Sequence, residues 1–155
     1  MTDKVGLKDS LHKVVIEGRY YGDKTFPSLN NYLAEIGKNP RAGGRMKKEY
    51  MWVCIAAIRK WLKGWKVTKP PIIIHYKIYE PNKGQKRDVM NTLCLIDKFF
   101  EDALQACGTI ENDNPAWVAN TTHEFYYIDQ EPRIEIEIEE RGTTCRRKRH
   151  SATRF

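Results

Sequence analysis

The sequence lacks long apolar runs and the common nucleotide-binding loops. No segment approaches the roughly 20 consecutive apolar residues that span a bilayer, and the opening MTDKVGLKDS has no apolar core of a signal peptide. We therefore expect a cytoplasmic protein that does not bind membranes. Neither GxxxxGKS, GxxxxGKT nor GxGxxG occurs, so no nucleotide cofactor is expected.

Paired cysteine motifs are also missing. The four cysteines, Cys54, Cys94, Cys107 and Cys145, form no CxxC and lie mostly in apolar helical surroundings. Their spacing therefore indicates neither a zinc site nor a disulfide framework. We expect them to be reduced, with the first three as small side chains in or near the core.

Acidic residues are the minority charge. The chain has 20 Asp and Glu against 27 Lys and Arg, which gives a formal net charge of +7 over 155 residues. A hydrophobic content of 41% is sufficient for one domain with a buried core. A small basic protein favours an acidic partner, of which nucleic acid is the commonest.

Apolar periodicity predicts four strands and two helices. The strands are expected at residues 13–20, 72–80, 117–128 and 133–140, and the helices at residues 47–64 and 89–107. The order β-α-β-α-β-β predicts an α/β sandwich of the α+β type, with two helices packed on one mixed sheet.

The remaining segments are expected to be irregular. Residues 24–48 contain two prolines and two adjacent glycines among six Lys and Arg, so we expect a long exposed segment that orders on a partner, with space for a short helix at residues 29–36. Residues 1–12 are predicted to be a flexible N-terminus and residues 13–140 the folded domain. The basic tail, residues 141–155, is predicted to be disordered; it either solubilises the protein or contacts phosphates.

Acidic residues lie at both ends of the predicted helix at residues 89–107. Asp88 follows two cations directly before it, and Glu111 and Asp113 lie in a turn after it. Taken singly, Asp88 is typical of a helix N-cap and Asp113 of a turn. The two ends can converge only if the next strand runs back alongside the helix, as in a β-α-β unit.

The motifs around this helix resemble the RusA family of Holliday junction resolvases, which are homodimeric endonucleases of phages and bacteria. The family pattern runs R-D-x-D-N, then a helix with Lys four residues before D-A-L, then Gly and a short turn that ends in Asp. Arg87, Asp88 and Asn91 in KRDVMN match the first motif. Lys98 with Asp102, Ala103 and Leu104 in DKFFEDALQACG match the second, and Gly108 and Asp113 match the third. Upstream, Pro27, Ser28 and Asn30 in FPSLNNY resemble the P-S-x-N loop of the family. The resemblance covers residues 13–140.

The resemblance implies a metal-dependent endonuclease that resolves Holliday junctions or other branched DNA by paired nicks in recombination and repair. It implies a homodimer in a bacterial cell, encoded by the bacterium or a prophage. Phosphodiester hydrolysis at neutral pH needs a divalent cation, and Mg²⁺ or Mn²⁺ prefers carboxylate oxygen. The implied roles are metal binding and catalysis for Asp88 and Asp113, phosphate stabilisation for Lys98, and DNA binding for Arg87, Lys86, Asn91 and Asn30.

One position departs from the family pattern. The carboxylate expected two residues after Asp88 is Met90, and a thioether does not ligate Mg²⁺. Either another acid replaces it, with Glu80 preferred to Asp97 and Glu111, or the protein binds branched DNA selectively without cutting it. A third hypothesis is a basic scaffold or RNA-binding protein whose motif match is accidental.

Three tryptophans, Trp52, Trp61 and Trp65, recur at helical spacing with lysines between them. Core packing or a dimer interface is favoured for them. A surface that stacks nucleic-acid bases is the alternative.

Overall fold

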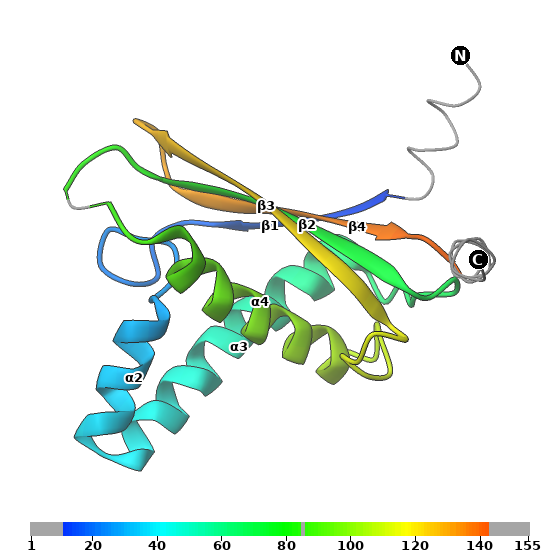
Figure 1. Cartoon of the computed structure of the whole chain (residues 1–155), viewed down its shortest axis with the longest axis horizontal. Helices are drawn as coiled ribbons and strands as arrows, with labels where there is room; N and C mark the ends of the chain where they lie inside the picture. Colours follow the sequence, from blue (N-terminus) through cyan, green and yellow to red (C-terminus); the bar gives the residue numbers. More distant parts are fainter. Residues whose placement is uncertain (1–10, 85, 143–155) are drawn as a thin grey trace, which may run out of the picture.

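The computed structural model describes residues 11–84 and 86–142 (Figure 1). The elements are β1 (Leu11–Glu17), α2 (Leu29–Lys38), α3 (Pro40–Leu62), β2 (Ile72–Pro81), α4 (Val89–Ala106), β3 (Val118–Ile128) and β4 (Arg133–Glu140). The predicted α+β class with a mixed sheet is confirmed. The predicted N-terminus lies outside the described residues up to residue 10, and the predicted tail lies outside them from residue 143. Among the described helices, none has the length and hydropathy needed to cross a bilayer.

The described strands form one sheet in the order β1-β4-β2-β3. Strand β4 pairs antiparallel with both β1 and β2, whereas β2 and β3 are parallel and are joined through α4. In β4, Ile134, Ile136 and Ile138 are fully buried, while the glutamates between them are half-buried. This alternation follows from the two-residue period of a strand. The helices lie on one side of the sheet, and no described helix covers its other side, which we call the open face (Figure 1).

Strand β2 is central, as predicted, because it lies between β4 and β3. Its first residues, 72–74, are buried on both faces. From His75 onward the strand alternates, with Lys77 and Tyr79 half-buried toward the open face. The predicted burial on both faces therefore applies only to the start of the strand.

Helix α4 buries two faces rather than one. The residues predicted to face the core and found buried are Leu93, Ile96, Phe100 and Ala103. Leu95 was predicted on the opposite, exposed face but is also buried. Helix α3 covers that side: the rings of Phe99 and Tyr50 lie 6.5 Å apart and nearly parallel.

The segment at residues 24–48 is exposed over much of its length, as expected, but it is helical from residue 29 onward except at Asn39, with a helix where a short one was allowed for. Ser28 caps α2, since its Oγ accepts the Asn31 N–H at 3.2 Å and Asn31 Oδ1 accepts the Ser28 N–H at 2.8 Å. Pro40 is the first residue of α3, where the missing N–H costs nothing. The proline therefore begins the helix that it was expected to exclude.

Two glycines inside α3 have different environments. Gly43 is buried under α2, and a Cβ built on it would lie 2.5 Å from Ile36 Cγ1. Gly44 faces open space, with no atom within 4 Å of such a Cβ. The close approach of α2 and α3 therefore requires a glycine at residue 43 only.

Core packing was expected for three cysteines and was one of the two favoured roles of three tryptophans, and of the latter only Trp65 packs against the core. Cys54 is buried, but Cys94 is exposed on α4. Trp52 is 53% exposed and Trp61 40% exposed, so neither belongs to the core.

Candidate metal and DNA site around helix α4

Asp88 is the N-cap of α4. Its Oδ1 accepts the backbone N–H of Asn91 at 3.1 Å, and its charge lies at the positive end of the helix dipole. Asn91 Oδ1 in turn accepts the backbone N–H of Asn30, at the start of α2, at 3.2 Å. Two motifs that are about sixty residues apart in sequence therefore meet at the beginning of α4.

Arg87 and Glu80 form a buried ion pair at the same end. One guanidinium nitrogen of Arg87 donates to Glu80 and another donates to the carbonyl oxygen of Phe26. Glu80 is 1% exposed. Because a buried carboxylate needs its cation, Glu80 is not available as the replacement metal ligand, which corrects that prediction. Arg87 is likewise engaged within the chain instead of facing a DNA backbone.

Lys86 remains at the surface beside the end of β3. Its Nζ donates to Asn82 Oδ1 at 3.1 Å and lies 3.8 Å from the centre of the Tyr127 ring. Among the residues predicted to contact DNA, Asn91 and Asn30 are hydrogen-bonded to each other, and Lys86 lies two residues before the N-cap of the same helix.

The second half of α4 carries a group of acids. Asp97 Oδ1 accepts the hydroxyl of the buried Tyr76 at 2.6 Å. Burial first, then the hydrogen bond with Asp97 and the charges of Asp97, Asp113 and Asp102, raise the pKa of Glu101 to about 9. Glu101 therefore holds a proton at neutral pH, because ionisation would place another negative charge in this group.

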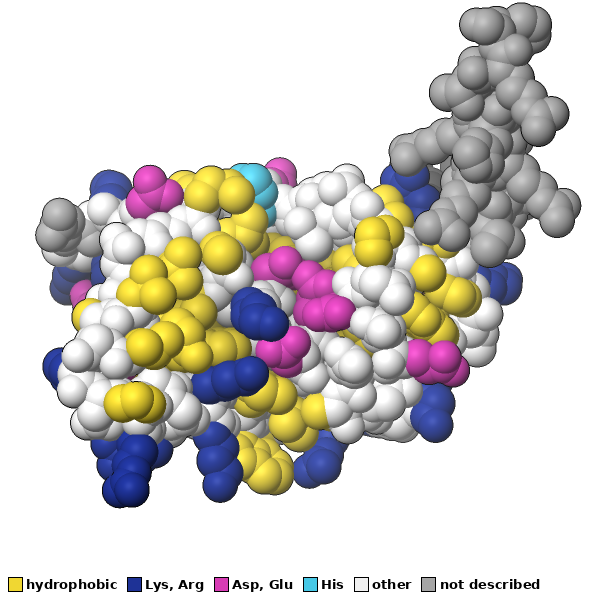
Figure 2. All heavy atoms as spheres, turned by 60° about the horizontal axis from the view of Figure 1, so that its bottom comes forward, with side chains coloured by type: hydrophobic (Ala, Val, Ile, Leu, Met, Phe, Trp, Pro, Cys, Tyr) yellow, Lys and Arg dark blue, Asp and Glu magenta, His cyan; other side chains and the backbone are white. Residues whose placement is uncertain are grey.

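Lysines border the acidic group. Asp102 Oδ2 lies 3.4 Å from Lys98 Nζ and 3.9 Å from Lys47 Nζ. The pair Lys98–Asp102 was predicted from its spacing of four residues. Figure 2 shows acidic side chains gathered on the helical face with basic side chains next to them. Anionic and cationic groups are thus adjacent there, as a site for a metal and a phosphate requires.

Helix α4 separates the two predicted metal ligands. Its 18 residues span about 27 Å at about 1.5 Å per residue, with Asp88 at one end and Asp113 beyond the other. Strand β3 does run back alongside the helix, but Asp113 precedes the strand and stays at the far end. The residue that returns to the beginning of α4 is Ile128, which is paired with Pro81. This corrects the expectation that one chain brings Asp88 and Asp113 together.

The donor set for a cation is incomplete within one chain. Across residues 11–84 and 86–142, no three His, Cys, Asp or Glu side chains are grouped so that they could hold a metal ion. The carboxyl groups of Glu101 and Asp113 suit a hard cation, since positive charge would offset both the burial that chiefly raises the pKa of Glu101 and the smaller effect of the neighbouring acids. A complete site would need ligands from another molecule.

Glu101 and Tyr76 were not among the predicted site residues. Glu101 lies four residues after Asp97, so the two share one helix face, and this spacing is the signal that could have revealed the pair. Tyr76 has no such signal, because its contact with Asp97 depends on how α4 packs on β2. Glu111, weighed as a replacement ligand, is exposed in the turn after α4.

Comparison with known proteins adds no family assignment: no family model matches the chain, and no curated protein matches it.

Proposed function

We propose that the protein is a divalent-metal-dependent endonuclease that nicks branched DNA as a homodimer in the bacterial cytoplasm. The observation that carries this proposal is the acidic group at Glu101 and Asp113, which lies next to the lysine-bordered Asp102. The ordered motifs, which resemble RusA resolvases, support the same chemistry. An α+β fold with the motifs around one helix is compatible with it.

A second copy of the chain supplies the missing carboxylate. Asp88 and Asp113 mark opposite ends of α4, so two copies with antiparallel α4 helices bring Asp88 of each beside Asp113 of the other. A two-fold axis then creates two identical sites. The nearly two-fold symmetry of a four-way junction suits two such sites, one for each opposing strand.

The outer surface of α4 is suited to this pairing. Met90 is 58% exposed and Cys94, four residues later, is also exposed. Exposed apolar side chains on one helix face are typical of a protein–protein contact. In this proposal Met90 belongs to the dimer contact, and the carboxylate that it replaces is not needed for metal binding.

The proposed metal ligands, Asp88 and Asp113, have a different role from Lys98. A divalent cation held by Asp88 and Asp113 would make a bound water nucleophilic near neutral pH. Lys98, whose Nζ lies 3.4 Å from Asp102, would supply positive charge to the DNA backbone at this site.

The test is nicking of a synthetic four-way junction in Mg²⁺ or Mn²⁺. We expect paired nicks, loss of product by at least about 100-fold in Asp88→Asn and in Asp113→Asn, and loss in the presence of EDTA. Asp129→Asn is the matched control, because Asp129 is an exposed acid in the loop between β3 and β4. Equal loss in all three variants would mean that only net charge matters, contrary to the proposal.

A non-catalytic protein that binds branched DNA is the second candidate. The incomplete donor set within one chain favours it. Tight binding to a four-way junction with no product at any Mg²⁺ or Mn²⁺ concentration would support this candidate and overturn the nuclease. Equal affinity for linear duplex and junction would overturn both.

A further inference from the structure

The exposed aromatic side chains of α3 have no structural role in the core. The same helix buries Tyr50, Cys54 and Ile58, so its apolar face is complete without Trp52 and Trp61. Large aromatic side chains left in solvent mark binding surfaces more often than scattered small apolar ones do.

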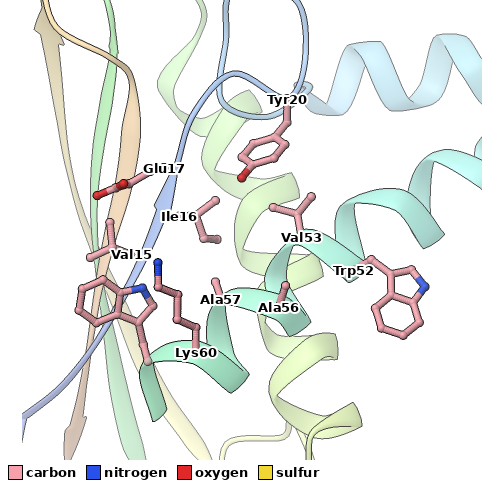
Figure 3. A pocket seen from close by; sticks show the side chains of 10 residues that line it. Val15, Ile16, Glu17, Tyr20, Trp52, Val53, Ala56, Ala57 and Lys60 are labelled. Atoms are coloured by element: carbon pink, nitrogen blue, oxygen red, sulfur yellow. The ribbon is translucent and has the colours of Figure 1, made fainter. Parts of the chain in front are cut away.

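Trp52 forms the wall between two hollows. A groove of about 500 Å³ lies between β1 and α3, with Tyr20, Lys60 and Trp61 among its lining residues (Figure 3). A second hollow of about 330 Å³ is lined by Lys47 and Lys48. Trp52 lines both, so each hollow has an aromatic wall and at least one cation, and the first hollow also has one acid, Glu17.

The surroundings of Trp52 on α3 are basic. Helix α3 carries six cations, Arg41, Arg45, Lys47, Lys48, Arg59 and Lys60, and one acid, Glu49. The Arg59 guanidinium carbon lies 5.9 Å from the centre of the Trp52 ring, and Lys60 Nζ lies 6.0 Å from that of Trp61. On the open face of the sheet, Lys13 and Arg133 pair with Glu135, and Arg141 pairs with Glu139, so these cations are already neutralised. A polyanion is therefore attracted to the cations of α3.

We propose that Trp52, with the hollows on either side of it, is a stacking site for unpaired bases of a DNA strand whose phosphates lie on the lysines of α3. Bases stack on tryptophan whatever their identity, while Lys and Arg neutralise the backbone. Bases inside a duplex already have both faces covered, so only unpaired bases can use the site. DNA is the ligand only if the proposed function holds, and the inference rests on that function.

A second copy of the chain is a poorer occupant of this surface. A two-fold contact through α3 would bring the six cations of one copy against the same cations of the other. Like charges facing each other across an interface oppose association. Charge complementarity thus favours a nucleic-acid strand over self-association at this face.

The test measures affinity for a labelled oligo-dT strand and for a blunt duplex of the same length. Trp52→Ala is expected to weaken oligo-dT binding by about 5- to 100-fold and duplex binding by less than about 2-fold. Trp52→Phe, which keeps an aromatic face, is expected to retain most of the affinity. Tyr126→Ala is the matched control, because Tyr126 is 40% exposed on β3.

The outcomes separate this inference from the proposed function. Unchanged oligo-dT affinity in Trp52→Ala, with nicking intact, overturns the stacking site alone. Trp52-dependent oligo-dT binding without nicking of any junction overturns the nuclease and leaves the stacking site. If Trp52→Ala changes the sedimentation mass, the surface is an interface between copies and the inference is wrong.

Discussion

Asp88 and Asp113 lie at opposite ends of α4, the first as its N-cap and the second beyond its C-cap residue Cys107. The helix between them is too long for both carboxylates to reach one cation in a single chain. A shared cation therefore requires two chains, and a dimer becomes part of the catalytic proposal rather than an addition to it.

The two roles of Asp88 can be separated by the choice of substitution. Asparagine caps a helix about as well as aspartate, whereas alanine costs about 1 kcal/mol. We therefore expect Asp88→Asn to unfold in urea like the wild type and Asp88→Ala to be less stable by about 1 kcal/mol. Both variants are expected to lose nicking. Normal nicking by Asp88→Asn would show that Asp88 is only a cap.

The buried pair Glu80–Arg87 is expected to be structural. Removing one partner leaves an unpaired buried charge, so Arg87→Ala should lower the free energy of unfolding by about 3–5 kcal/mol. The double variant Glu80→Gln/Arg87→Met removes both charges and should recover part of that loss. If Arg87→Ala instead keeps full stability but weakens DNA binding and reduces its salt dependence, Arg87 contacts phosphate.

The raised pKa of Glu101 predicts that the stability of the protein depends on pH. Its pKa rises from 4.5 to about 9 on folding, so the folded state holds the proton more tightly than the unfolded chain. The free energy of unfolding contributed by Glu101 is therefore present below about pH 4.5 and falls as the pH rises toward about 9. Because glutamine cannot ionise, the Glu101→Gln variant should not lose this free energy of unfolding as the pH rises.

The measurement is urea unfolding of wild type and Glu101→Gln across this pH range. The stability difference should grow with pH in favour of the variant, on the order of 1 kcal/mol, because the carboxyl group is partly solvated. Mg²⁺ should reduce the difference by stabilising the ionised wild type. A difference that does not change with pH would show that Glu101 is ionised in the folded protein.

Adding one methyl group at Gly43 or at Gly44 of α3 should change stability in opposite directions. Gly43→Ala places a Cβ 2.5 Å from Ile36 Cγ1, so α2 must shift and the protein should lose about 1–3 kcal/mol of stability. Gly44→Ala meets no atom and should gain about 0.5–1 kcal/mol, because alanine favours the helix. Thermal unfolding of both variants checks this, and equal effects would contradict the close contact of α2 with α3.

Local sequence patterns predicted the parts of the fold that depend on local periodicity. The alternation of Ile134, Ile136 and Ile138 sets one face of β4 against the core, and the apolar stripe of α4 does the same for that helix. Asn30 and Asn91, which the resemblance assigned to DNA binding, meet at the beginning of α4, a contact that was not predicted.

Features that depend on packing between elements were not predictable from such patterns. Gly43 and Pro40 favour a loop by propensity, but contact with α2 and a position in the first helical turn make them compatible with α3. Glu80 is a surface residue by type, and only its pairing with Arg87 explains its burial. The place of Asp113 depended on where β3 begins, which the sequence does not specify to within a few residues.

The most direct measurement is junction nicking by a mixture of Asp88→Asn and Asp113→Asn chains, coexpressed so that subunits can assort. If sites form between chains, each mixed dimer has one intact site, so two inactive variants together should recover about one quarter of wild-type nicking. Wild type coexpressed with the double variant Asp88→Asn/Asp113→Asn is the control: if sites form between chains, only the wild-type homodimers nick and about one quarter of the activity remains, whereas sites within single chains would leave about one half. No recovery of nicking in the first mixture would contradict a site shared between two chains.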